Sequence, residues 1–313
     1  MKSPNFLIIG AAKSGTTTLS DAFAEHPDIY MSPIKETNFF SLFEEDINFL
    51  RKSVNEEYLN DCVTDMRTYE ALFQEASTER AVGEASPSYL YFPKAAQRIR
   101  NYNSNIKLIA VLRNPVDRAY SNFLHHVRDE LETESEFYKG ICLEQRRIDE
   151  NWWWGFHYIQ AGLYYKQLKV YFDLFDRSQI KIYLYDDLAK SAVDVVQDAY
   201  KFIGVNEQFE PNLLIQKNVT GVPKNKNLNA FLRDGNIVKT IFKPLIPEKI
   251  RKAVIFELNK KNLEKPNISS KFREELIDIF REDTLKLQTL INRDLSSWLD
   301  ESEKCEDGQV ATL

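Results

Sequence analysis

The chain has 313 residues and a net charge of −6, with 43% hydrophobic and 28% charged residues, which is ordinary for a soluble globular protein. The acidic balance argues against a general binder of nucleic acid or of another polyanion. No apolar run approaches the roughly 20 residues of a membrane-spanning helix, and the N-terminus lacks the pattern of a secretory signal. Three scattered cysteines (Cys62, Cys142 and Cys305) suit neither a disulfide framework nor a zinc site, so we expect a cytoplasmic protein.

Apolar runs alternate with helical patterns along the chain. We predict strands at residues 5–10, 29–31, 81–84, 106–112 and 180–185. Helices are predicted at residues 16–25, 93–104, 115–130, 192–203 and 271–293, with mostly helical segments at 44–79 and 135–175. Strands that alternate with helices form a parallel sheet covered on both faces, and ligands bind beyond the carboxyl ends of its strands. Lys13, Glu36, Glu84 and Arg113 all follow such ends and predict one crevice.

The domain organisation is expected to be simple. Residues 1–300 are interpreted as one domain, and residues 301–313 as a flexible acidic tail. Residues 224–265 carry eleven Lys or Arg against four Asp or Glu, a local excess of positive charge. We interpret a segment at about 217–265 either as a basic flap near an anionic ligand or as a solvated basic face.

The loop after the first strand carries the strongest motif, Gly10-Ala-Ala-Lys13-Ser14-Gly15-Thr16-Thr17-Thr18. The N–H groups at the start of the following helix, the helix dipole, the hydroxyls and the lysine all favour one bound anion. The ATPase P-loop places its lysine after the second glycine, whereas Lys13 precedes Gly15. We therefore predict a P-loop-like three-layer α/β core with a central parallel sheet flanked by helices.

A second anion site is predicted where the central strand ends. Arg113 stands there instead of an aspartate, which favours a phosphate over a metal ion, and its fork binds phosphate bidentately. Ser121 lies about two helical turns later and adds a hydroxyl donor.

Four segments of the chain resemble the PAPS-dependent sulfotransferases, in particular the branch of bacterial and heparan sulfate enzymes. They lie at residues 13–18, 112–121, 162–188 and 280–298. The resemblance implies metal-independent transfer of a sulfuryl group from PAPS (3′-phosphoadenosine 5′-phosphosulfate) to a hydroxyl or amine of a small molecule or saccharide. It also implies that residues 13–18 bind the 5′-phosphosulfate, and that Arg113 and Ser121 bind the 3′-phosphate.

The resemblance and the residues together name three catalytic candidates. Lys13 is expected to stabilise the departing phosphate oxygen. Glu36, followed by Thr-Asn-Phe-Phe, matches the glutamate proposed as the base in heparan sulfate sulfotransferases. His125 lies four residues after Ser121, on the same helical face, and is the second candidate for the base.

Two departures from the family pattern limit which residue roles can be carried over to this chain. Ala85 stands where the heparan sulfate branch has a lysine, so a catalytic lysine from that loop is not expected. The C-terminal Lys-Gly-Arg loop is also absent. Residues 217–226 take its place, and Lys224 and Lys226 are the candidates there to bind the 3′-phosphate. Trp152–Trp154 either line the acceptor pocket or pack in the core. The acidic surface favours a neutral or cationic acceptor.

An ATP-dependent kinase and a non-catalytic nucleotide-binding module remain as alternatives, and the oligomeric state is not predicted.

Overall fold

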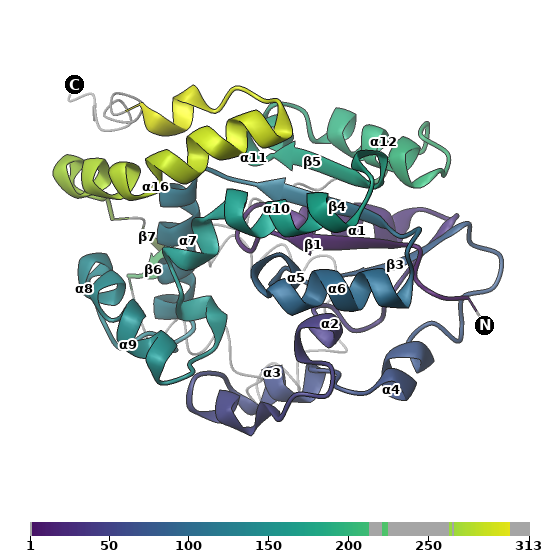
Figure 1. The fold of residues 1–313 in the computed structure, drawn as a ribbon, viewed down its shortest axis with the longest axis horizontal. Coiled ribbons are helices and arrows are strands. Elements are labelled where there is room, and N and C mark those ends of the chain that lie inside the picture. Colours follow the sequence, from purple (N-terminus) through teal and green to yellow (C-terminus); the bar gives the residue numbers. More distant parts are fainter. Residues whose placement is uncertain (1, 213–220, 225–262, 265, 301–313) are drawn as a thin grey trace, which may run out of the picture.

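The computed structural model describes residues 2–212, 221–224, 263–264 and 266–300. Its centre is a parallel sheet with the strand order β2-β3-β1-β4-β5 (Figure 1). The five predicted strands are confirmed, as β1 (Phe6–Gly10), β2 (Ile29–Met31), β3 (Ala81–Ala85), β4 (Lys107–Leu112) and β5 (Ile180–Leu184). Strands β2 and β3 lie on one side of β1, and strands β4 and β5 lie on the other. The adjacent ends of β1 and β4 therefore form the switch point at which such sheets bind ligands.

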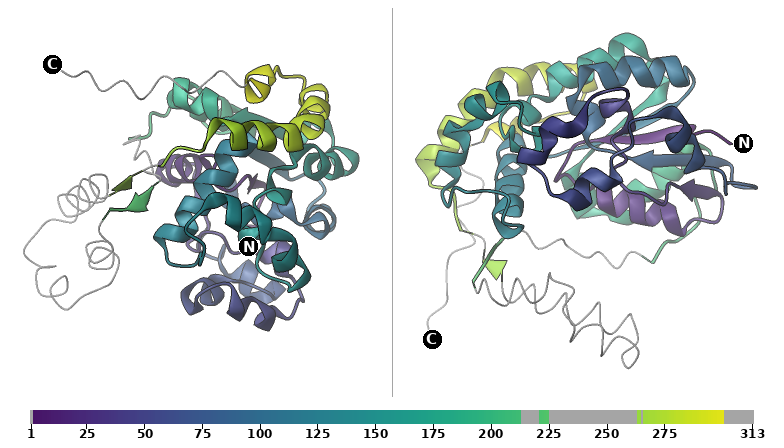
Figure 2. Two further views of the ribbon diagram at one scale, coloured as in Figure 1. Left: turned by 90° about the vertical axis from the view of Figure 1, so that its left-hand side faces the viewer. Right: turned by 90° about the horizontal axis from the view of Figure 1, so that it is seen from below.

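Alternation of side chains along the strands creates two cores. Leu7 and Ile9 of β1 pack into one, and Phe6 and Ile8 pack into the other. The first core is covered by α2 (Phe39–Leu42), α5 (Ser88–Tyr91), α6 (Pro93–Tyr102), α10 (Tyr164–Leu174) and α16 (Ser270–Ile291). The second is covered by α1 (Thr16–Glu25), α11 (Tyr185–Lys190) and α12 (Ala192–Ile203). Figure 2 shows helices on both sides of the sheet, so the predicted three-layer fold is confirmed.

The remaining elements lie around the sheet. Helix α7 (Pro115–Arg128) lies beyond the carboxyl ends of the strands, at the left of the sheet in Figure 1. Smaller helices are α3 (Glu56–Asp61), α4 (Met66–Ala71), α8 (Phe137–Cys142) and α9 (Glu144–Asp149), and 3-10 turns occur at Ile47–Lys52, Trp154–Phe156, Gln160–Gly162, Arg177–Gln179 and Ser296–Leu299. Strands β6 (Val222–Pro223) and β7 (Leu263–Glu264) pair antiparallel, and β6 lies against α7.

Several short elements differ from the sequence prediction. The strand predicted to reach Tyr185 ends at Leu184, because the Asp187 carboxylate accepts the Leu184 N–H at 3.0 Å and starts helix α11. Helix α5 and the β6–β7 pair were also missed, since one helical turn or a two-residue strand has too little periodicity to read. The 301–313 tail and most of the 217–265 segment lie outside the described residues.

Contacts between distant segments explain why the sequence motifs occur together. Arg293 pairs with Asp187 at 2.9 Å, which fixes the end of α16 on α11. Asp283 of α16 accepts the Tyr165 N–H at 2.9 Å, at the start of α10. The Asn114 amide donates to the Trp298 carbonyl at 3.4 Å. The third motif segment (residues 162–188) and the fourth (residues 280–298) are therefore bonded to each other. The fourth is also bonded to the turn that follows β4.

Gly15 lies where the loop after β1 packs against Leu188 of α11, so a substitution of Gly15 tests that contact. Its φ of 98° is left-handed, and an added Cβ would lie 2.9 Å from Cδ1 of Leu188. We expect Gly15→Ala to lower the free energy of unfolding by more than the about 1–2 kcal/mol that left-handed backbone costs an L-residue. Urea unfolding measures this loss.

Gly204→Ala is the matched control, because Gly204 has a φ of 90° while its added Cβ would meet nothing closer than Lys107 Nζ at 3.8 Å. The contact between Gly15 and Leu188 is refuted if the two substitutions destabilise the protein equally.

Candidate active site

The loop after β1 presents a helix N-terminus to the carboxyl edge of the sheet. Gly15 precedes α1 and has no side chain to cap it, and the first turn of α1 contains no acidic residue. The first N–H groups of the helix are therefore suited to an external anion. Ser14 and Thr16 are buried, whereas Thr17 and Thr18 are half-buried and border the same turn.

Arg113 connects the two predicted anion-binding segments. Its Nη1 donates to the Lys13 carbonyl at 3.1 Å, and its guanidinium stacks 4.5 Å from the centre of the Tyr185 ring. The Tyr164 hydroxyl donates to the Arg113 carbonyl at 3.1 Å. Ser121 is buried on α7, the helix that follows Arg113. The end of β4 is thereby fixed against the loop after β1.

Lys13 carries an unusual backbone and a perturbed charge. Its φ of 64° is left-handed, a conformation that costs a side-chain-bearing residue energy and that occurs often at functional sites. Burial and the neighbouring Arg128 lower the pKa of Lys13 to about 8, against the opposing influence of Asp129 and Glu36. At neutral pH most of these ammonium groups are still charged.

Glu36 shares both properties with Lys13. Its φ is 60°, and its N–H donates to the Ala85 carbonyl at 3.1 Å, which seats the loop on the end of β3. Burial raises the pKa of the Glu36 carboxyl, while Lys35 and Lys13 act in the opposite direction. The structure thus brings Glu36 within electrostatic reach of Lys13, although 23 positions separate them in the sequence.

His125 also faces Lys13, but its imidazole is held neutral. Burial and the positive charge of Lys13 lower the pKa of His125 to about 3, even though Asp129 lies 3.4 Å away. Arg128 Nη2 lies 2.6 Å from Nδ1 of His125. A guanidinium can only donate, so Nδ1 accepts and the proton of the neutral ring resides on Nε2.

Three charged residues of this site were missed in the sequence. Arg128 and Asp129 lie three and four positions after His125, and that helical spacing was the available signal. Lys35 donates from Nζ to the Thr17 hydroxyl at 2.8 Å, so it joins the Glu36 loop to helix α1. The signal available in the sequence for Lys35 was its position directly before Glu36.

The remaining predicted residues lie at the end of β6, in the core or outside the described residues. Lys224 is exposed at the end of β6, and Lys226 lies outside the described residues. Trp153 and Trp154 are buried in a core cluster, which confirms the packing interpretation for two of the three tryptophans. The placement of Glu84 in the crevice was wrong: it lies within β3 and is fully buried, because β3 continues to Ala85.

Two further observations concern the described part of the chain. It contains no helix that is both long and apolar enough to cross a membrane, and no group of three or more His, Cys, Asp or Glu side chains placed to hold a metal ion. A surface hollow of about 490 Å³ lies between α10 and α16, lined by Tyr165, Glu282, Leu285, Lys286, Thr289 and Leu290. It shares no residue with the anion-binding loop, so we do not assign the chemistry to it.

Comparison with known proteins identifies the family. Residues 3–265 match the sulfotransferase domain family. The chain belongs to the sulfotransferase family. A sulfotransferase from Alicyclobacillus acidocaldarius has a similar crystal structure, with 34% identity, a TM-score of 0.74, and coverage of 96% of this chain and all of that one.

Curated relatives of this sulfotransferase chain are more distant. The membrane-associated sulfotransferase kil1 of Dictyostelium discoideum is 22% identical over 73% of this chain and 62% of its own length. Human carbohydrate sulfotransferase 15 is 24% identical over 64% of this chain and 44% of its own length. The chain thus spans roughly half the length of these curated relatives.

Proposed function

We propose that this protein transfers a sulfuryl group from PAPS to a hydroxyl or amine of a neutral or cationic acceptor. The observation that carries the proposal is the bond from Arg113 to the Lys13 carbonyl, which joins the two segments that we predict to bind anions. PAPS carries a 5′-phosphosulfate and a 3′-phosphate on one ribose and requires two such segments. Residues 13–18 suit the first group, and Arg113 with Ser121 suits the second.

Lys13 is assigned to the leaving group. Negative charge grows on the 5′-phosphate oxygen as its bond to sulfur breaks, as in the related phosphoryl transfers. An ammonium fixed in a buried site stabilises such charge far better than one in water. The left-handed backbone of Lys13 supports this role, since the surrounding structure maintains a conformation that the residue alone disfavours.

Glu36 is assigned as the base. The acceptor oxygen or nitrogen uses its lone pair to bond to sulfur, the electron pair of the broken bond stays on the phosphate oxygen, and Glu36 takes the acceptor proton. The raised pKa of Glu36 makes its carboxylate a stronger base. His125 suits the task less, because a pKa of about 3 makes it a weak base and Arg128 already occupies Nδ1.

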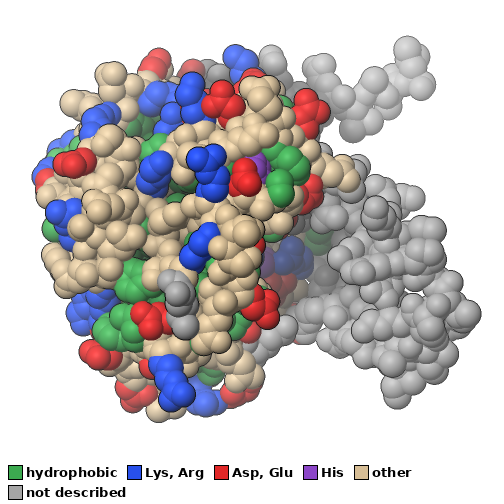
Figure 3. Space-filling view, turned by 90° about the vertical axis from the view of Figure 1, so that its right-hand side faces the viewer, with side chains coloured by type: hydrophobic (Ala, Val, Ile, Leu, Met, Phe, Trp, Pro, Cys, Tyr) green, Lys and Arg blue, Asp and Glu red, His purple; other side chains and the backbone are tan. Residues whose placement is uncertain are grey.

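The class of acceptor is inferred from charge and from relatives. The chain carries −6 overall, and basic and acidic side chains are interspersed on the face drawn in Figure 3, which lies at the end of the molecule away from the carboxyl ends of the strands (Figure 1). Near Lys13 the acidic Glu36 and Asp129 are accompanied by the basic Arg113 and Arg128, so the site itself does not select the sign of the acceptor. The net negative charge of the whole chain disfavours a polyanionic acceptor more than an amine or a neutral hydroxyl. The relationship to a carbohydrate sulfotransferase brings saccharides into this proposal.

Nucleotide binding tests the donor. We expect 3′-phosphoadenosine 5′-phosphate (PAP) to raise the melting temperature of the protein more than ATP with Mg²⁺ does, because only PAP supplies a phosphate to both anion sites. Arg113→Met should remove most of the advantage of PAP. Stabilisation by ATP with Mg²⁺ alone would instead support a kinase.

Single-turnover transfer from ³⁵S-labelled PAPS tests the base. The acceptors are a glucosamine tetrasaccharide, 2-naphthol, sulfated heparan chains as the polyanionic comparison, and water. We expect Glu36→Gln to slow transfer by about 100-fold or more, with PAP affinity kept, since removal of a general base costs roughly 10²–10⁴-fold. His125→Ala should cost less.

The pH dependence of kcat/KM for PAPS gives a second readout of the same variants. Activity of the wild type should rise with pH as the Glu36 carboxyl loses its proton, and fall above about pH 8 as Lys13 does. Loss of transfer in His125→Ala with full activity in Glu36→Gln would reverse the assignment of the base. Transfer to the sulfated chains alone would overturn the acceptor class.

A further inference from the structure

A buried polar cluster lies directly behind the Glu36 loop, and the proposed chemistry makes no use of it. Glu84 and Ser86 are fully buried, and Asn38 is 1% exposed. Burying a carboxyl group costs free energy unless hydrogen bonds compensate for lost water. One oxygen of Glu84, Oε2, accepts the Ser86 hydroxyl at 2.7 Å. The Ser86 hydroxyl therefore offsets part of the cost of burying the Glu84 carboxyl.

A chain of hydrogen bonds leads from Glu84 to Glu36. The Ser86 hydroxyl gives its one proton to Glu84, so its oxygen is left to accept the Asn38 N–H at 3.1 Å. The side-chain amide of Asn38 donates to the Glu36 carbonyl at 2.6 Å. Of these groups only the Ser86 hydroxyl can either donate or accept, so Glu84 sets the direction of the Ser86 bonds alone.

The backbone that these bonds hold is strained. Glu36 has a φ of 60° and Asn38 a φ of 53°. Asparagine tolerates the left-handed region, whereas glutamate adopts it only where the surroundings impose it. The bonds to both residues supply that constraint at the point where Glu36 turns toward Lys13.

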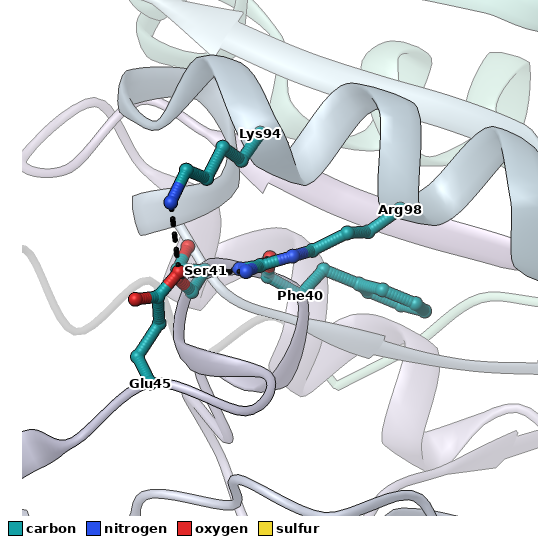
Figure 4. A network of polar contacts seen from close by, with 5 residues as sticks. All are labelled: Phe40, Ser41, Glu45, Lys94 and Arg98. Carbon is teal, nitrogen blue, oxygen red and sulfur yellow. Dashed lines mark hydrogen bonds and ion pairs between the residues drawn. The ribbon is translucent and has the colours of Figure 1, made fainter.

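The segment after Asn38 is anchored separately. Arg98 of α6 donates from Nη1 to the carbonyls of Phe40 and Ser41 at 3.1 and 3.0 Å, and pairs with Glu45 at 2.7 Å (Figure 4). Lys94 also bonds to Glu45 at 3.1 Å. Helix α2 is therefore fixed to α6 without help from Glu84. Residues 36–38 are held by the cluster together with the bond from the Val63 N–H to the Thr37 carbonyl (2.9 Å) and the bond from the Ser88 hydroxyl to Asn38 Oδ1 (2.6 Å).

We propose that Ser86, whose proton Glu84 accepts, is a positioning residue that acts through Asn38 to hold Glu36 in the left-handed conformation near Lys13. The inference rests on the proposed function, because it assumes that Glu36 accepts the proton of the acceptor.

The surroundings of Glu84 suit its role as the acceptor of the Ser86 proton. The hydroxyls of Tyr69 and Tyr89 face its carboxyl, and Glu36 is the charged neighbour that acts on it. Burial, with a further contribution from Glu36, raises the pKa of Glu84 to about 7. A neutral Glu84 still accepts the Ser86 proton, so the hydrogen-bond series survives protonation.

The test uses the full-length protein with Ser86→Ala, Glu84→Gln and Tyr200→Phe. Ser86→Ala removes the acceptor for the Asn38 N–H, whereas Glu84→Gln keeps an oxygen for Ser86. Tyr200→Phe is the matched control, because it deletes a buried bond to the Ala22 carbonyl (2.7 Å) on the opposite face of the sheet. Two quantities are measured. The first is the single-turnover rate of ³⁵S transfer from PAPS to the glucosamine tetrasaccharide, to 2-naphthol or to water. The second is the affinity of each variant for PAP.

We expect Ser86→Ala to slow transfer by about 10- to 100-fold, the range that a small misplacement of a catalytic group can produce, while PAP affinity changes by less than about threefold. Glu84→Gln and Tyr200→Phe should each stay within about threefold of the wild-type rate. In a Glu36→Gln background, Ser86→Ala should cause no further loss, because the group that it positions is already gone.

A wild-type rate in Ser86→Ala, an equal loss in Tyr200→Phe, or an equal loss in the Glu36→Gln background overturns the inference. These results leave the proposed function intact. A wild-type rate in Glu36→Gln alone refutes the assignment of the base itself, so the two failures are distinguishable.

Discussion

One hydrogen bond, from Arg113 to the Lys13 carbonyl, joins the ends of the two central strands. It matters because β1 and β4 are neighbours in the sheet, yet the residues that follow them are 100 positions apart in sequence. The bond uses one of the five N–H donors of Arg113, and stacking on Tyr185 fixes the plane of the others. The predicted anion-binding loop and the predicted phosphate-binding arginine are therefore in direct contact.

Left-handed backbone occurs at several residues of the described chain, among them two at the same edge. Lys13 and Glu36, the two residues assigned to charge stabilisation and proton removal, both have left-handed φ values. Each is held there by contacts from elsewhere: Arg113 bonds to the Lys13 carbonyl, and Asn38 bonds to the Glu36 carbonyl. The strain is thus tied to the position of the charged groups, and the buried cluster around Glu84 belongs to the site as its support.

The sequence was sufficient for the sheet, because hydrophobic runs and turn residues are local signals, and for the proximity of Lys13, Glu36 and Arg113, because carboxyl ends of parallel strands meet at one edge. It could not supply the state of His125, which depends on Arg128 and on burial beside Lys13. Nor could it show that Glu84 is fully buried, since that depends on the helices and loops that cover its face of β3.

The central claim is that the two anion sites bind the two phosphates of one nucleotide, and a crystal structure of the PAP complex tests it most directly. The account predicts the 5′-phosphate on the N–H groups at the start of α1 with Lys13 Nζ in contact, and the 3′-phosphate on Arg113 and Ser121. A complex in which the 3′-phosphate lies away from Arg113 would contradict it.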